Sequence, residues 1–193
     1  MHDAVAVKVE PAEIPIGKLG MWIFLVSEIM FFTGLIGSYI VLRLGSAMWP
    51  RPGEVLNTGL LALNTLVLIS SCFTMALSLD AAKQGRPQRL RFFLLLTACL
   101  GSTFLLIKLY DYWHMWHRGF TITAHLFGSC YYLLTGFHAL HVLSGIILLA
   151  YLFTAASRGM CSATRDGRIE YSGLYWHFID IVWVILFAIL CLV

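Results

Sequence analysis

The sequence predicts an all-α membrane protein, a bundle of five transmembrane helices. Apolar residues make up 60% of the 193 residues and charged residues only 12%, whereas soluble domains have roughly 45–50% and about 25%. The apolar residues also form five long continuous stretches. They do not alternate with polar residues, so a membrane β-barrel is excluded.

Each stretch has the ~20 apolar residues that a helix needs to cross the hydrocarbon core of a bilayer. The first, Leu19–Leu42, is followed by a segment rich in proline and glycine at 49–53, and the second, Leu56–Leu79, by Gly85 and Pro87. Such residues mark connections between helices. The remaining three stretches are Phe92–Tyr112, Leu126–Phe153, which Arg158 and Gly159 follow, and Leu174–Val193.

The chain is expected to form one domain. Residues 18–193 hold the five helices, and residues 1–17 form a cytoplasmic N-terminal segment. This segment is mixed and partly charged, unlike a cleavable signal peptide, which has a basic stretch followed by a short apolar core. We find no internal repeat and no low-complexity segment.

The positive charges predict the orientation. The side with the N-terminus and the second and fourth connections carries Lys8, Lys18, Lys83, Arg86, Arg89, Arg91, Arg158, Arg165 and Arg168. The opposite side carries only Arg43, Arg51 and Arg118. Because cytoplasmic loops are enriched in Lys and Arg, the N-terminus is expected in the cytoplasm and the C-terminus in the periplasm.

Composition and cysteine spacing also exclude several classes of function. A net charge of +3 gives no indication of nucleic-acid binding. The five cysteines stand singly, without the C-x-x-C spacing of c-type haem, zinc or thioredoxin-like sites, and the four within apolar stretches are expected to be packing residues. We therefore expect no metal ligands and no catalytic residues. A phosphate-binding loop and the broken helices of secondary transporters are also missing from the pattern.

Glu28 is the most unusual residue of the first stretch. It follows Leu19 by nine residues, which places it about 13 Å into the span, close to the membrane midplane. A charge there costs about 2.5–3.5 kcal/mol on insertion scales. We therefore expect Glu28 to be protonated, paired across helices or facing bound water. Two roles stay open: a proton- or lipid-headgroup-linked site, and a neutral acid that joins two helices.

His138 and His141 lie near the middle of the fourth stretch, three residues apart and so on one helical face. Haem in a membrane bundle takes its axial ligands from facing helices, which this spacing does not provide. We expect these histidines to form interhelical hydrogen bonds, because buried polar groups seek partners.

The fifth stretch opens with aromatic and ionisable residues. Trp176, Asp180 and Trp183 share one helical face, and His177 lies three residues before Asp180. We expect Trp176 and His177 in the interfacial aromatic belt, and Asp180 one turn deeper in a structural polar contact.

Lys108 and Asp111, three residues apart at the outer end of the third stretch, are expected to neutralise each other. We also expect both side chains to extend to the membrane surface.

These residues and their flanks resemble subunit III of the haem–copper respiratory oxidases, in its short five-helix bacterial form found with cytochrome c oxidases. The resemblance covers residues 17–192. It rests on segment 20–28 ending in Ser-Glu, on Asn-Thr at 64–65 and Ser-Ser at 70–71, on segment 128–145 with its Gly-Phe-His-Ala-Leu-His core, and on segment 175–183.

The resemblance implies a non-catalytic subunit in the bacterial plasma membrane that binds no haem or copper itself. Such a subunit packs against catalytic subunit I and other subunits, which hold the haem and copper. It also binds phospholipid and supports proton uptake. Glu28 would then be the family's buried carboxylate. The helix-packing or lipid-contact residues would be His138, His141, His177, Asp180, Trp176 and Trp183.

Longer relatives have two further helices ahead of the Glu-bearing one, with a lipid cleft between that pair and the rest. A similar cleft in this chain would need another subunit. Short relatives also occur with quinol oxidases and nitric oxide reductases, and Asn64-Thr65 favours cytochrome c oxidase. Two hypotheses from other classes stay open: a proton-coupled transporter using Glu28, and a membrane cytochrome with His138 or His141 as haem ligands.

Overall fold

The structure is a computed structural model that describes residues 16–46, 49–50, 55–123, 125–159 and 167–192. Every long element in this part of the chain is an α-helix. The predicted N-terminal segment 1–17 lies outside it, apart from its last two residues. The helices are α1 (Ile16–Gly45), α3 (Thr58–Lys83), α4 (Pro87–His117), α5 (Leu126–Ser157) and α6 (Arg168–Leu192).

All five helices are long and apolar enough to cross a membrane, so the five predicted spans are confirmed. Most run a few residues beyond the predicted bounds. For example, α4 begins at Pro87 and not at Phe92, and it ends at His117 and not at Tyr112. The prediction followed apolar residues alone, whereas a helix continues through polar residues until a cap or a turn satisfies its terminal backbone groups.

The connection between α3 and α4 shows how such an end is built. Gly85 has a φ of 64°, a left-handed conformation that glycine adopts without steric cost. Its N–H donates to the carbonyl of Ala82 at 3.0 Å. Pro87 then occupies the first turn of α4, where a missing N–H leaves no hydrogen bond unmade. Two antiparallel spans are thus joined by a short turn.

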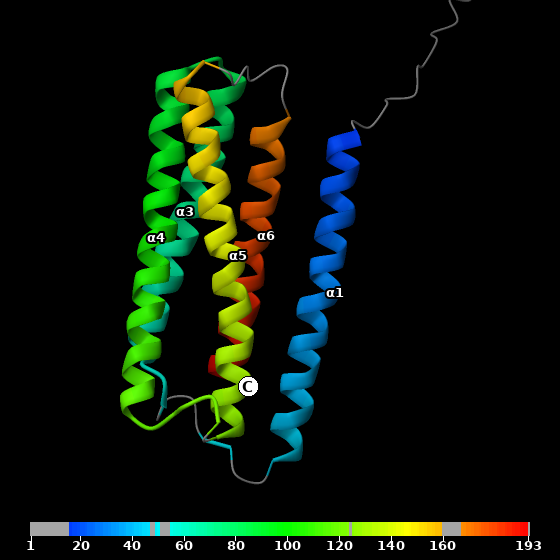
Figure 1. Cartoon of the computed structure of the whole chain (residues 1–193), viewed down its shortest axis with the longest axis vertical. Helices are drawn as coiled ribbons and strands as arrows, with labels where there is room; N and C mark the ends of the chain where they lie inside the picture. Colours follow the sequence, from blue (N-terminus) through cyan, green and yellow to red (C-terminus); the bar gives the residue numbers. More distant parts are fainter. Residues whose placement is uncertain (1–15, 47–48, 51–54, 124, 160–166, 193) are drawn as a thin grey trace, which may run out of the picture.

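Helices α3, α4, α5 and α6 form a four-helix bundle in which α3 packs on α4, α4 on α5, α5 on α6 and α6 on α3. Helix α1 contacts only the α5–α6 side among these pairs, and Figure 1 shows it standing at the edge of the bundle. α1 is also the most exposed of the five spans.

Trp176 of α6 lies at the centre of the bundle and is 1% exposed. Its ring packs against Gly101 of α4 and Gly145 of α5. A Cβ atom at Gly101 would lie 2.7 Å from the ring, and one at Gly145 would lie 2.9 Å from it. Small residues that let helices approach closely are typical of membrane helix interfaces. Here the two glycines make room for one indole.

Two turns further along α6, Trp183 is also fully buried. Its ring lies edge-on to Phe104 of α4, with 4.8 Å between ring centroids, and 4.9 Å from the ring of His138 of α5. The two tryptophans therefore fill the space between α3, α4 and α5, on the face that the sequence predicted.

A groove of about 450 Å³ separates α1 from α6. It is lined on both sides by apolar residues, among them Leu25, Phe32 and Ile36 of α1 and Phe178 and Val182 of α6. The side chain of His177 also borders it. The groove reflects the loose attachment of α1 to the bundle.

Candidate functional site: the Glu28–His141 pair and its surroundings

The carboxyl group of Glu28 in α1 meets the imidazole of His141 in α5. Glu28 Oε2 and His141 Nε2 are 2.9 Å apart. Both side chains are mostly buried, with 19% of Glu28 and 17% of His141 exposed. Of the three states expected for Glu28, the structure shows pairing across helices.

The other ring nitrogen of His141 fixes the number of protons in this contact. Nδ1 lies 2.7 Å from the backbone carbonyl of Phe137, which only accepts hydrogen bonds, so Nδ1 carries a hydrogen. The contact between Nε2 and Oε2 then holds one further proton, on the carboxyl group or on the imidazole. In both arrangements the pair has no net charge, and this makes its place within the membrane spans tolerable.

The pair lies where α1, α5 and α6 meet. The ring of Phe32 lies 5.1 Å from that of His141, and the ring of Phe24 lies 5.8 Å from that of Tyr175 in α6. The Tyr175 hydroxyl is hydrogen-bonded to Ser144 of α5 at 2.7 Å and also donates to the carbonyl of His141 at 3.4 Å. A polar chain therefore runs from α1 through α5 to α6.

Both buried tryptophans make hydrogen bonds to α3. Trp176 Nε1 donates to the Ser71 hydroxyl and Trp183 Nε1 to the Thr65 hydroxyl, each at 3.0 Å. Interhelical bonds of this kind hold membrane helices in register. The predicted position of Trp176 in the interfacial aromatic belt is wrong, because its ring is enclosed between helices and has no surface to reach.

His138 differs from the prediction. It is 1% exposed, and neither ring nitrogen has a hydrogen-bond partner among the described residues. Its ring packs between the rings of Phe104 and Trp183, with centroid distances of 5.8 and 4.9 Å. The expected interhelical hydrogen bond is therefore wrong for His138, whose contacts are aromatic, although His141 makes one.

Asp180 and His177 do not pair with each other through a hydrogen bond. His177 Nδ1 lies 2.9 Å from the sulfur of Cys72 in α3. Asp180 is 5% exposed, and neither of its carboxyl oxygens has a hydrogen-bond partner in the described part of the chain. The polar contact that we expected for Asp180 is thus not a hydrogen bond.

Lys108 and Asp111 of α4 are joined as predicted, at 3.3 Å, but they do not reach the surface. Lys108 is 2% and Asp111 7% exposed. Both meet the hydroxyl of Tyr131 in α5 at 2.5 Å, and the Lys108 ammonium also lies 4.6 Å from the centre of that ring. The expectation of a surface position is wrong because α5 and α6 cover this part of α4, and a single helix does not show such neighbours.

The fold and these contacts can be compared with known proteins. A model of the family described as cytochrome c oxidase subunit III matches residues 12–192. The chain belongs to this family. The resemblance found in the sequence motifs is therefore confirmed, over almost the whole chain.

Three members of the subunit III family illustrate the similarity. Cytochrome c oxidase subunit 3 of Thermostichus vulcanus is 35% identical over 173 residues, which cover 89% of this chain and 85% of the relative. The probable cytochrome c oxidase subunit 3 of Nocardia farcinica is 36% identical, with shares of 89% and 85%. Cytochrome c oxidase subunit 3 of Synechocystis is 38% identical, and the match covers 90% of this chain and 74% of the relative.

Three polar residues of this subunit III chain escaped the sequence analysis: Tyr131, Ser144 and Tyr175. Tyr131 bridges Lys108 and Asp111, and the other two join α5 to α6 beside the Glu28–His141 pair. Hydroxyl groups in membrane helices are common, and most bond to their own backbone. A buried ion pair needs further hydrogen bonds, which would have pointed to a residue such as Tyr131, but the burial of Lys108 and Asp111 appears only in the structure.

Proposed function

We propose that this chain is the non-catalytic subunit III of a bacterial haem–copper terminal oxidase. In this role it packs against catalytic subunit I and other subunits, which hold the haem and copper. It supports the stability of the complex, lipid binding and proton uptake. The match to the subunit III family over residues 12–192 is the observation that carries this proposal.

The electron donor that fits best is cytochrome c. The relatives described above are named as subunits of cytochrome c oxidases, and this favours that type over a quinol oxidase or a nitric oxide reductase. Several described polar groups of the spans bond to neighbouring helices, as in a scaffold. This arrangement offers little support for a proton-coupled transporter or for a membrane cytochrome.

Glu28 is proposed as the residue that links this subunit to protons or lipid headgroups. The Glu28–His141 pair holds one proton in a contact that is about one-fifth exposed, at the edge of the bundle. A partly accessible acid–base pair of this kind can exchange its proton without a change in net charge. Helix packing is the proposed role of His138, His177, Asp180, Trp176 and Trp183.

The groove between α1 and α6 is proposed to hold an acyl chain of a phospholipid. Its volume of about 450 Å³ and its apolar walls suit a hydrocarbon chain. The excess of Lys and Arg on one side of the spans supports an N-terminus in the cytoplasm and a C-terminus in the periplasm. The plasma membrane of a bacterium is the proposed location.

Copurification tests the main proposal. The chain, carrying a tag, is purified in mild detergent, and a reduced-minus-oxidised spectrum is recorded with identification of the subunits. We expect larger subunits with haem absorption, which are lost in harsher detergent while this chain stays colourless. A chain that emerges alone and colourless would favour the transporter, and one that is red by itself would favour the cytochrome.

Substitution of Glu28 in the purified complex tests its proposed role. We expect Glu28→Gln to leave the haem spectrum unchanged and to lower proton pumping or the number of turnovers before activity is lost. Glu170→Gln is the matched control, because Glu170 is ion-paired with Lys18 at the end of the spans at 2.8 Å. An altered haem spectrum with unaffected turnover would contradict the assignment.

A further inference from the structure

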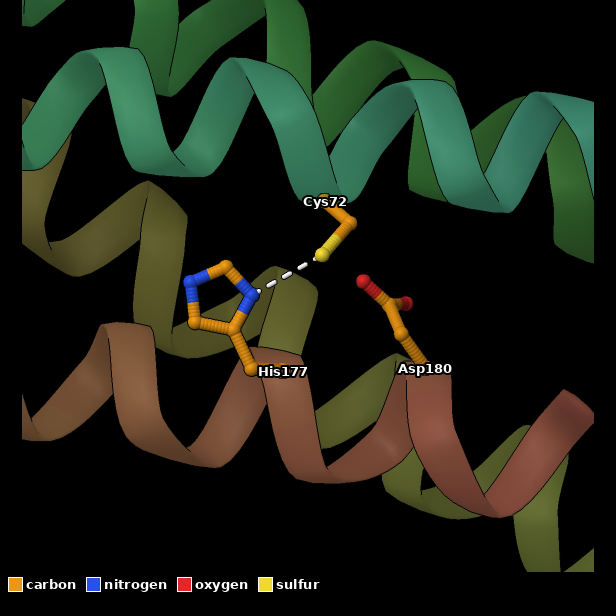
Figure 2. Close-up of side chains that lie close together, drawn as sticks. All are labelled: Cys72, His177 and Asp180. Atoms are coloured by element: carbon orange, nitrogen blue, oxygen red, sulfur yellow. Dashed lines mark hydrogen bonds between the residues drawn. The ribbon is translucent and has the colours of Figure 1, made fainter.

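Cys72 of α3 and His177 and Asp180 of α6 form a cluster where these two helices pack. Each residue offers one ligand atom, and the three atoms all lie within 4.8 Å of one another. The closest pair is Cys72 Sγ and His177 Nδ1, at 2.9 Å. Figure 2 shows the thiol and the carboxyl group turned toward each other from opposite helices.

Asp180 is the residue of this cluster whose polar atoms are unpaired among the described residues. It is only 5% exposed, and neither carboxyl oxygen has a hydrogen-bond partner among the described residues. Buried polar groups are nearly always paired, and most strictly so within a membrane, where water cannot take the place of a partner. The carboxyl group points to the cluster, so the missing partner belongs between Asp180, Cys72 and His177.

We propose that this cluster binds a Zn²⁺ ion that fastens α3 to α6. Thiolate, imidazole and carboxylate groups are the three ligand types that zinc takes in proteins, commonly in a tetrahedral arrangement. Cys72, His177 and Asp180 supply one of each, and water takes the fourth position. His177 also borders the groove between α1 and α6.

The geometry suits this ion. Zinc–sulfur and zinc–nitrogen distances of about 2.3 and about 2.0–2.1 Å at a tetrahedral angle place the two atoms about 3.6 Å apart. Cys72 Sγ and His177 Nδ1 lie at 2.9 Å and thus need to separate by only about 0.7 Å. His177 and Asp180 are three residues apart on α6, so both side chains reach the same ion from one helical face.

The charges of the three ligands also suit a Zn²⁺ ion. Zinc binding releases the thiol proton of Cys72 and the carboxyl proton of Asp180 to the solvent, because the thiolate and the carboxylate are the forms that bind the ion. A thiolate and a carboxylate then balance the two positive charges of the ion, with a neutral imidazole as the third ligand. The occupied site has no net charge, which is the arrangement that a membrane interior tolerates best.

Metal content of the intact purified complex tests the proposal. Complexes with the natural chain, with Cys72→Ala and with Cys130→Ala are washed with a chelator, incubated with Zn²⁺ and desalted, and their zinc is measured. Cys130 is the matched control, a buried cysteine of α5 outside the cluster. We expect the natural and Cys130→Ala complexes to retain one more zinc per complex than the Cys72→Ala complex. Equal retention by all three would overturn the proposal.

A spectroscopic measurement on the natural complex covers the case in which a variant fails to assemble. X-ray absorption at the zinc edge is expected to show one sulfur at about 2.3 Å beside nitrogen and oxygen ligands at about 2.0–2.2 Å. Incubation with Co²⁺ in place of Zn²⁺ should give the near-ultraviolet band of a thiolate–cobalt bond. A zinc shell without sulfur, or cobalt binding without that band, would overturn the proposal. Neither readout depends on oxidase activity, so the proposed function is tested separately.

Discussion

Glu28 Oε2 and His141 Nε2, 2.9 Å apart, join α1 to α5, and they do so at the least buried helix of the bundle. In the described part of the chain, the ion pair of Lys18 with Glu170 is the other charged contact of α1, and it lies at the helix end with both side chains about 40% exposed. Exposed pairs contribute little to stability. The attachment of α1 therefore depends mainly on apolar packing and on the Glu28–His141 contact.

Replacing Glu28 by Leu should destabilise the docking of α1 by about 1–3 kcal/mol, because His141 Nε2 is left without a partner in a largely buried position. Glu28→Gln should cost less, since an amide N–H can donate to Nε2. Equilibrium unfolding of the purified chain in mixed detergent micelles measures both changes. If Glu28→Leu were as stable as the natural chain, the contact would contribute nothing to the fold.

The glycines beside Trp176 give a second prediction. Gly145→Ala should destabilise the bundle by about 1–3 kcal/mol, because the new Cβ atom would lie 2.9 Å from the indole ring. Gly101→Ala should act in the same way, at 2.7 Å. The thermal unfolding midpoint of the purified chain in detergent measures the effect.

Gly34→Ala in α1 is the matched control, since no atom lies within 4 Å of the added Cβ atom there. Alanine favours a helix over glycine by about 1 kcal/mol, so this variant should be neutral or slightly more stable. The packing argument fails if Gly145→Ala and Gly34→Ala shift the midpoint equally.

Hydropathy and the proline and glycine residues between the apolar stretches were sufficient to predict the five spans, because the bilayer imposes length and composition on each helix separately. The face formed by Trp176, Asp180 and Trp183 and the Lys108–Asp111 pair also followed from spacing within one helix. Contacts between helices could not be predicted from this spacing. The sequence does not show that α1 lies beside α5, so the partner of Glu28, 113 residues away, could not be named.

The same limit explains two wrong expectations. The hydrogen bond expected for His138 required a polar group on a neighbouring helix. The side chains that pack against His138 are instead the rings of Phe104 and Trp183. Lys108 was expected at the surface because α4 alone offers it no cover, whereas Tyr131 of α5 and Trp183 of α6 enclose it. Which faces oppose each other is a property of the assembled bundle.

The buried Lys108–Asp111 pair yields a third prediction. Lys108→Met alone should destabilise the chain by about 3–5 kcal/mol, because it leaves the Asp111 carboxylate without its counter-charge in a position only 7% exposed. The double variant Lys108→Met with Asp111→Asn should recover most of this loss. The amide that Asp111→Asn introduces is neutral, and its oxygen can still accept the hydrogen bond of the Tyr131 hydroxyl.

Unfolding of the two variants in mixed micelles compares the costs directly. A double variant less stable than Lys108→Met would contradict the argument, since it would mean that the unpaired Asp111 carboxylate costs less in this position than a neutral amide does. The single variant Asp111→Asn completes the comparison. It should also be destabilised, because it leaves the buried ammonium of Lys108 without its carboxylate.

The hydrogen bond from Trp183 to Thr65 gives the last prediction, which a double-mutant cycle tests. Thr65 Oγ1 accepts from the indole at 3.0 Å and itself donates to the carbonyl of Leu61 at 2.9 Å. Trp183→Phe and Thr65→Val each remove this bond. Their effects on the free energy of unfolding should therefore be less than additive, by about 0.6 kcal/mol and at most about 1.7 kcal/mol, the range measured for interhelical bonds in membranes.

Thr103→Val provides the control cycle. The Thr103 hydroxyl bonds to the carbonyl of Cys99 in its own helix at 2.9 Å and is exposed, so it shares no contact with Trp183. Trp183→Phe combined with Thr103→Val should be additive within about 0.3–0.5 kcal/mol. Additivity in both cycles would show that Trp183 holds α6 against α3 by packing alone, because the lost hydrogen bond would then have no measurable energy.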